Sequence, residues 1–308
     1  MSLYNRQHVR RHFSKAAERY DEAAVLQKLT AQELDQRLDL IKLEVNNLVD
    51  LGAGTGFLTE KLHARYPNAR LCAIDLSDAM LQRARQRLDH QAWWLKIKAL
   101  FTPKKLHFMQ ADAYSLPLAD GSQDLVITNF MLQWCDDLDA VLAEIRRVLR
   151  PEGLLMLSSL GPDTLKELRQ AWVDVEGDAG HDRLNQFVDM HDLGDALIRA
   201  GFGQSVMDVE HYTLTYDQPI GVLRDLKAIG ATNAHNQRGH SLLGKHKFSQ
   251  MLKAYDNLRK EGKVPATFEV VHGHAWAAPE LIKGPNRNKT GVHEITLDQF
   301  QNLVKTEK

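Results

Sequence analysis

Apolar runs and helical stretches alternate through the first half of the chain. Residues 47–51, 70–75, 106–110, 124–129 and 153–159 are short apolar runs of the kind that forms buried strands. Between them, residues 57–66, 77–88 and 138–149 have helical spacing, and Gly or Pro follows several of them. This alternation predicts an α/β fold with a doubly wound, mostly parallel sheet and helices on both faces.

The second half departs from this regular alternation. Two further strands are expected at residues 204–216 and 267–276, which would complete a seven-stranded Rossmann-like sheet with an antiparallel edge hairpin. Helices are expected at 163–173, 192–200, 219–229 and 248–260, and also over 6–44, where neither Gly nor Pro occurs. We therefore predict a single domain over residues 1–279.

Three parts of the chain are expected to lie outside the basic sheet. Residues 160–190 and 217–262 are predicted to form a helical cap over the active site. The apolar segment 93–101 is interpreted as an extra packed helix or a partner contact, and residues 280–308 as a polar tail.

Composition narrows the class of protein. The 308 residues carry a formal net charge of -1 and contain two cysteines, Cys72 and Cys135. No run of about 18 apolar residues occurs, and no apolar signal segment opens the chain. We expect a cytoplasmic protein that binds neither nucleic acid nor a membrane.

A glycine-rich loop follows the first predicted strand. It runs through Asp50, Gly52, Ala53, Gly54 and Gly56, and glycines allow a bound ligand to approach the backbone closely. A G-x-G-x-G match alone also fits a dinucleotide site, but the helix glycine of that motif is missing. Because Asp50 is placed to bind an ammonium group, S-adenosyl-L-methionine is the predicted cofactor.

The next strands end in residues that fit the same cofactor. Asp75 is expected to bind the ribose hydroxyls and Asp112 the adenine amino group, because ligands bind at the carboxyl ends of such strands. The remaining predicted contacts are Leu76, the flexible thioether of Met80, the backbone N–H of Ala113, and Asn129. No metal ion is expected.

Several longer segments resemble one family within the class I methyltransferases. The chain contains VDLGAGTGFLTEKL, AIDLSDAML, GPDTLKELR, MHDLGDAL and IGATN. Together they resemble the malonyl-acyl-carrier-protein O-methyltransferases of biotin synthesis, from about residue 7 to residue 279. The opening HVRRHFSKAAERYDEAA resembles the N-terminal helix of that family, which implies that Tyr20 lies over the cofactor as a lid.

This resemblance implies methyl transfer from S-adenosylmethionine to the free carboxylate of a malonyl thioester on acyl carrier protein or coenzyme A. Such a carboxylate is already ionised at neutral pH, so no general base is expected. Arg169 is the first candidate to hold the carboxylate, because a guanidinium binds it bidentately. Gln133 or Trp134, after the fourth predicted strand, is expected to face the substrate, and His191, Asn233 and Lys227 are weaker candidates than Arg169.

Acyl carrier proteins are acidic, so a basic surface is expected to receive one. The candidate cluster comprises Arg238, His240, Lys245, His246 and Lys247. These charges would equally suit a solvated loop.

Three other functions remain open from the sequence. One is a protein-modifying factor of the respiratory complex I assembly type, which has a similar GxDTLxELR segment. Another is methylation of a small quinone-like metabolite. The third is an inactive scaffold with the same fold, against which the intact Asp50, glycines and Asp75 argue.

Overall fold

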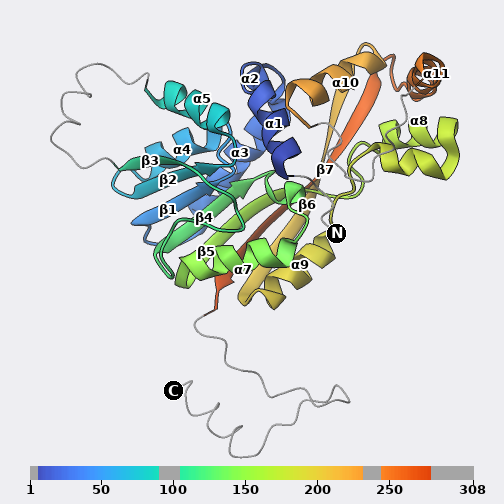
Figure 1. Ribbon diagram of the computed structural model, residues 1–308. Coiled ribbons are helices and arrows are strands. Elements are labelled where there is room, and N and C mark those ends of the chain that lie inside the picture. The colour runs from blue at the N-terminus through green and yellow to red at the C-terminus, as the bar shows by residue number, and fades with distance from the viewer. Residues whose placement is uncertain (1–5, 90–104, 232–243, 279–308) are drawn as a thin grey trace, which may run out of the picture.

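The computed structural model describes residues 6–89, 105–231 and 244–278, and their centre is a seven-stranded sheet (Figure 1). The strands are β1 Asn47–Leu51, β2 Arg70–Asp75, β3 Leu106–Gln110, β4 Gln123–Asn129, β5 Leu149–Leu160, β6 Phe202–Tyr216 and β7 Val264–Ala277. Their order is β3-β2-β1-β4-β5-β7-β6, and β7 alone runs antiparallel to its neighbours. The predicted fold class is confirmed.

The α-helices are α1 Arg6–Ala16, α2 Tyr20–Ala23, α3 Val25–Arg37, α4 Phe57–Arg65, α5 Asp78–Leu88, α7 Leu138–Val148, α8 Lys166–Glu176, α9 Met190–Arg199, α10 Pro219–Ala228 and α11 Lys245–Asp256. Short 3₁₀ helices are η1 Leu38–Leu40, η2 Leu132–Trp134 and η3 Gly177–Arg183. In the described part of the chain, no helix is both long enough and apolar enough to cross a membrane.

Different helices cover the two faces of the sheet. On one face, Leu34 of α3 and Leu62 of α4 share a buried cluster with the strand residue Ile127. On the other face, Ile145 of α7 and Leu197 of α9 share a second cluster with alternate residues of the same strands. This alternation of side chains follows from the pleat of the strands and makes the predicted double winding possible.

Helices α8, α10 and α11 lie together beyond one end of the sheet, and we call them the cap helices (Figure 1). Leu168, Val222 and Tyr255, one from each helix, form a third buried cluster with Phe268 of β7. The cap is therefore packed on the first half of β7.

One predicted element differs in the structure. Residues 6–44 form three α-helices and η1 rather than one continuous helix, because Ala16 and Ala17 end α1 while packed on Met80. Helix propensities describe isolated segments and do not account for such tertiary contacts. The predicted antiparallel pair of late strands is confirmed at the edge of the sheet, with the cap helices between the two strands in sequence; the order within the pair was not predicted, and β7 inserts between β5 and β6. Segment 93–101 and the tail 280–308 lie outside the described residues.

A fully buried histidine lies between α3 and the late strands. Neither ring nitrogen of His272 forms a hydrogen bond with a described residue, and its Nε2 lies 3.7 Å from Oε2 of Glu33. Burial, with a further contribution from the Arg37 guanidinium, lowers the pKa of His272 below its ordinary value. The folded protein therefore favours the neutral ring.

This burial makes stability sensitive to acid. The pKa of His272 is lower in the folded state than in the unfolded state. Protonation of His272 therefore does not reduce the free energy of unfolding above about pH 6.5, but it does so progressively as pH falls toward the folded pKa. Urea unfolding of His272→Gln should therefore show a shallower loss of stability between pH 7.5 and 5.5, by up to about 1.4 kcal/mol per pH unit. His211→Gln, at an exposed position on β6, is the control, and equal slopes in both variants would contradict the prediction.

Candidate functional site

The glycine loop is held in a conformation that larger residues rarely adopt. Gly52, Gly54 and Gly56 have φ values of +78°, +54° and +83°. A Cβ atom on Gly52 would lie 2.6 Å from Cβ of Met131, and one on Gly56 would lie 2.8 Å from Cβ of Ala84. Gly54 has no such neighbour. Two of the glycines therefore allow close packing, and the third leaves open space beside the loop.

Two buried carboxylates flank this loop. Asp50 is 1% exposed and accepts a hydrogen bond from Thr59 Oγ1 at 2.5 Å. Burial, together with the negative charge of Asp75, raises the pKa of Asp50 to about 7. Asp75 accepts from the backbone N–H groups of Gly54 at 2.9 Å and Ser77 at 2.7 Å, while burial raises its pKa. Both carboxylates are thus fixed in position but poorly compensated in charge.

A cavity lies at the carboxyl ends of β1, β2 and β4. The predicted cofactor contacts that line it are Tyr20, Gly52, Gly54, Asp75, Leu76, Met80, Asp112, Ala113 and Asn129. Asp50 and Ala53 line a smaller neighbouring pocket together with Tyr20 and Asn129. Gly56 contacts neither space and precedes α4.

The N-terminal helices form one wall of this cavity. Arg6, Val9 and Phe13 line it from successive turns of α1, and Tyr20 lines it from the start of α2. Arg6 donates to the carboxylate of Asp112 at 2.9 Å, so this predicted adenine contact already has a cationic partner. Except for Tyr20, the sequence reasoning missed these residues, although their spacing places them on one helical face.

Asn129 is engaged within the protein. Its Oδ1 accepts from Thr30 Oγ1 at 2.9 Å and from Ser158 Oγ at 2.6 Å. Its Nδ2 donates to the carbonyl of Gln27 at 2.9 Å. Asn129 therefore ties α3 to the ends of β4 and β5 at the edge of the cavity.

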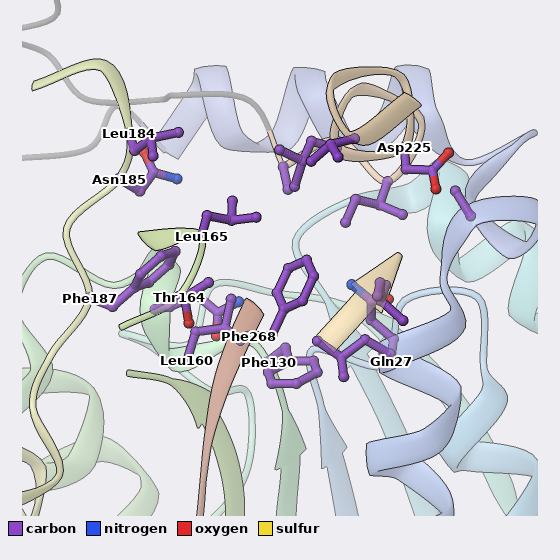
Figure 2. Close-up of a pocket in the computed structure, with 18 of the residues that line it drawn as sticks. Gln27, Phe130, Leu160, Thr164, Leu165, Leu184, Asn185, Phe187, Asp225 and Phe268 are labelled. Atoms are coloured by element: carbon purple, nitrogen blue, oxygen red, sulfur yellow. The ribbon is translucent and has the colours of Figure 1, made fainter. Parts of the chain in front are cut away.

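A second cavity lies against α10, whose Val222, Asp225 and Leu226 line it (Figure 2). It shares four aromatic residues with the first cavity: Phe13, Tyr20, Phe130 and Trp134. Phe13 and Trp134 meet edge to face, with ring centroids 5.2 Å apart. The two cavities therefore adjoin at these four aromatic side chains.

Comparisons with known proteins agree with this geometry. A family model described as a methyltransferase domain matches residues 49–157. A malonyl-acyl-carrier-protein O-methyltransferase from Gallionella capsiferriformans is 48% identical over 87% of this chain and 89% of its own. A protein of the same name from Laribacter hongkongensis is 50% identical over 87% and 88%. The chain belongs to the malonyl-acyl-carrier-protein O-methyltransferase family.

Solved structures agree on the fold. Phosphoethanolamine N-methyltransferase 2 from Haemonchus contortus, in complex with S-adenosyl-L-methionine, superposes with a TM-score of 0.52 at 16% identity. The alignment covers 86% of this chain and 57% of that one. The YcgJ protein from Bacillus subtilis gives a TM-score of 0.52 at 13% identity, covering 80% and 98%.

This family member is an S-adenosyl-L-methionine-dependent methyltransferase, and its first cavity fits that cofactor. An ammonium group would compensate the buried charge of Asp50. Each oxygen of Asp75 already accepts one backbone hydrogen bond and has a further lone pair for a ribose hydroxyl. The open space beside Gly54 lets a ligand reach the backbone.

The predicted substrate residues are not all brought together. Gln133 and Trp134 line the second cavity. Arg169 is half-buried on α8 but does not line it. The side chain of His191 is 85% exposed and bonded to Asp189 at the start of α9, so we withdraw it as a candidate. Lys227 is exposed on α10.

The predicted basic cluster is only partly described. Lys245, His246 and Lys247 are exposed in the first turn of α11. Lys247 pairs with Glu176 at 3.1 Å, which reduces its net positive charge. Asn233, Arg238 and His240 lie outside the described residues.

The raised pKa of Asp50 predicts a pH-dependent cofactor affinity. Below about pH 7 the free enzyme holds this carboxyl protonated, and the proton must leave before an ammonium can pair with it. Calorimetry should show S-adenosylmethionine affinity rising between pH 5.5 and 7, by up to about ten-fold per pH unit.

Asp50→Asn should bind more weakly and lose this slope. Asp112→Asn is the control, because Asp112 lies at the same cavity but has Arg6 as a partner. An unchanged slope in Asp50→Asn would contradict the assignment.

The close approach of Gly52 to Met131 predicts a specific stability loss. Left-handed backbone costs an alanine roughly 1–2 kcal/mol, and overpacking adds about 1–3 kcal/mol where atoms collide. Gly52→Ala should thus lower the free energy of unfolding more than Gly262→Ala, a position with φ +76° and no atom within 4 Å. Chemical denaturation measures both variants, and equal losses would show that the loop can shift.

Proposed function

We propose that the protein transfers the methyl group of S-adenosylmethionine to the free carboxylate of a malonyl thioester carried by acyl carrier protein. The product is the malonyl methyl ester that primes biotin synthesis. The observation that carries this proposal is the pair of cavities that meet at Phe13, Tyr20, Phe130 and Trp134. The names of the relatives supply the substrate class.

The reaction does not require a general base from the protein. A malonyl carboxylate, with a pKa near about 4, is already a nucleophile at neutral pH. The methyl donor supplies an electrophilic carbon on a positively charged sulfur. The protein must therefore align the two reactants and exclude water from them.

The second cavity suits that task. Leu160, Leu165 and Phe268 line it from β5, the start of α8 and β7 (Figure 2). Apolar walls remove water from the carboxylate and so strengthen its attraction to the donor's positive charge. Tyr20 lines both cavities, and burial raises the pKa of its hydroxyl, which keeps the ring neutral beside the reacting groups.

The exposed first turn of α11 is the part of the predicted docking surface that the structure describes. Its Lys245 and His246 would attract an acidic carrier protein. We place the reaction in the cytoplasm, since Cys72 and Cys135 are both free thiols.

Incubation with S-adenosylmethionine and malonyl-acyl carrier protein should give a carrier protein heavier by one methyl group in mass spectrometry. Acetyl-acyl carrier protein has no free carboxylate and is the matched control, so it should gain no mass. Expression of the protein should also restore biotin-independent growth to a strain that lacks this methyltransferase. A methyl group found instead on a protein side chain or a quinone would replace the proposed substrate and leave the cofactor assignment intact.

A further inference from the structure

Three side-chain amides line the second cavity. Gln27 comes from α3, Gln133 from η2, and Asn185 from the segment between η3 and α9. Figure 2 shows Gln27 and Asn185 on opposite sides of the cavity. Gln27 also lines the pocket beside the glycine loop, so it lies at the cofactor end.

Two of these amides have an oxygen atom without a partner among the residues that the structure describes. The side-chain oxygens Oε1 of Gln133 and Oδ1 of Asn185 are buried and form no hydrogen bond with any described residue. Buried side-chain amides normally have at least one partner, and exceptions call for an explanation such as a bound ligand. Each amide offers both donors and an acceptor, and rotation about its last bond exchanges them.

The charged residues of this cavity are already engaged. Of the residues that the structure describes, Arg183 and Asp225 are the charged ones that line it. Arg183 binds Glu176 through two hydrogen bonds, of 2.5 and 2.8 Å, and lies over the ring of Trp172. Asp225 accepts from the hydroxyl of Tyr216 at 3.0 Å. The cavity thus offers uncommitted amides but, among these residues, no uncommitted cation.

We propose that neutral amides, rather than an arginine, hold the malonyl thioester. Gln27 and Gln133 donate N–H groups to the malonyl carboxylate at the cofactor end. Asn185, on the far side, binds an amide of the pantetheine-like arm that carries the thioester. This inference rests on the proposed function and assigns the recognition of its substrate.

Neutral recognition has a chemical consequence. A guanidinium would stabilise the carboxylate before transfer and make its lone pair less reactive, whereas amides orient it with a smaller effect. The sulfonium of the methyl donor then becomes the charge partner of the carboxylate. A carboxylate oxygen lone pair forms the new C–O bond, and the pair of the broken C–S bond remains on sulfur. Both opposite charges disappear, so the ester product loses the attraction that held the substrate.

The kinetic test uses near-isosteric variants with malonyl-CoA, which removes any contribution from carrier-protein docking. Gln27→Met, Gln133→Met and Asn185→Leu should each raise KM by about ten-fold or more, because each loses hydrogen bonds to substrate. Gln133 and Asn185 line only the second cavity, so the affinity of Gln133→Met and Asn185→Leu for S-adenosylmethionine, measured by calorimetry, should be unchanged, which also shows that these two variants fold. Gln133→Glu should abolish turnover through repulsion of the carboxylate.

Two controls separate the amides from other contacts. Arg169→Ala removes a half-buried cation on the cap helix α8 that does not line the cavity, and its KM should stay unchanged. The malonyl thioester of ethanethiol has no amide in its arm, so Asn185→Leu should leave its KM unchanged. A raised KM in Arg169→Ala, with normal values in the amide variants, would overturn the inference.

A binding experiment tests the charge argument without turnover. Malonyl-CoA should bind at least about ten-fold more tightly to the complex with sinefungin, which has an ammonium in place of the methylsulfonium, than to the complex with neutral S-adenosylhomocysteine. Equal affinities would overturn the charge pairing. If wild-type protein forms no methyl ester from any malonyl thioester, the proposed function itself fails and this inference with it. If wild type turns over while the amide variants behave normally, only the inference fails.

Discussion

The close approach of the glycine loop to the ends of the neighbouring strands is the constraint on which the site depends. Gly52 packs against Met131 so closely that no side chain fits between them, and Gly56 does the same against Ala84. This packing brings the ends of β1, β2 and β4 to one rim. Asp50 and Asp75 are both buried there, and burial together with the negative charge of Asp75 raises the cost of ionising Asp50. A cationic, hydroxyl-bearing cofactor relieves this cost, so the loop conformation and cofactor choice are linked.

The two cavities divide the chemistry between polar and apolar surroundings. The cofactor cavity has carboxylates and backbone N–H groups in fixed positions, and the substrate cavity has apolar walls with a few amides. Phe13 and Tyr20 reach this boundary from the N-terminal helices, and Phe130 and Trp134 reach it from the end of β4. The N-terminal helices and the cap therefore complete a site that the sheet alone leaves open.

The cofactor residues could be predicted because their positions follow from local rules. Parallel strands end at a common edge, so Asp50, Asp75 and Asp112 had to lie near one another once the strands were recognised. The substrate residues obey no such rule. Arg169 and His191 have suitable chemistry, but the direction of a helical side chain depends on packing, which leaves Arg169 half-buried and outside the cavity lining and leaves His191 in solvent. Asn185 lies in an irregular segment with no periodic signal, and its unpartnered oxygen is visible only in the folded chain.

The sequence by itself determined the order of strands and helices, the glycine loop and the acidic residues at the strand ends, because these depend on spacing along the chain. Its longer motifs also indicated the family. Only the tertiary structure decided where the helices of residues 6–44 end and that β7 inserts between β5 and β6. It also decided that Arg6 pairs with the carboxylate of Asp112. It also decided which residues surround the second cavity. These features arise from contacts between residues far apart in the chain, and such contacts cannot be predicted from secondary-structure propensity or hydrophobic periodicity.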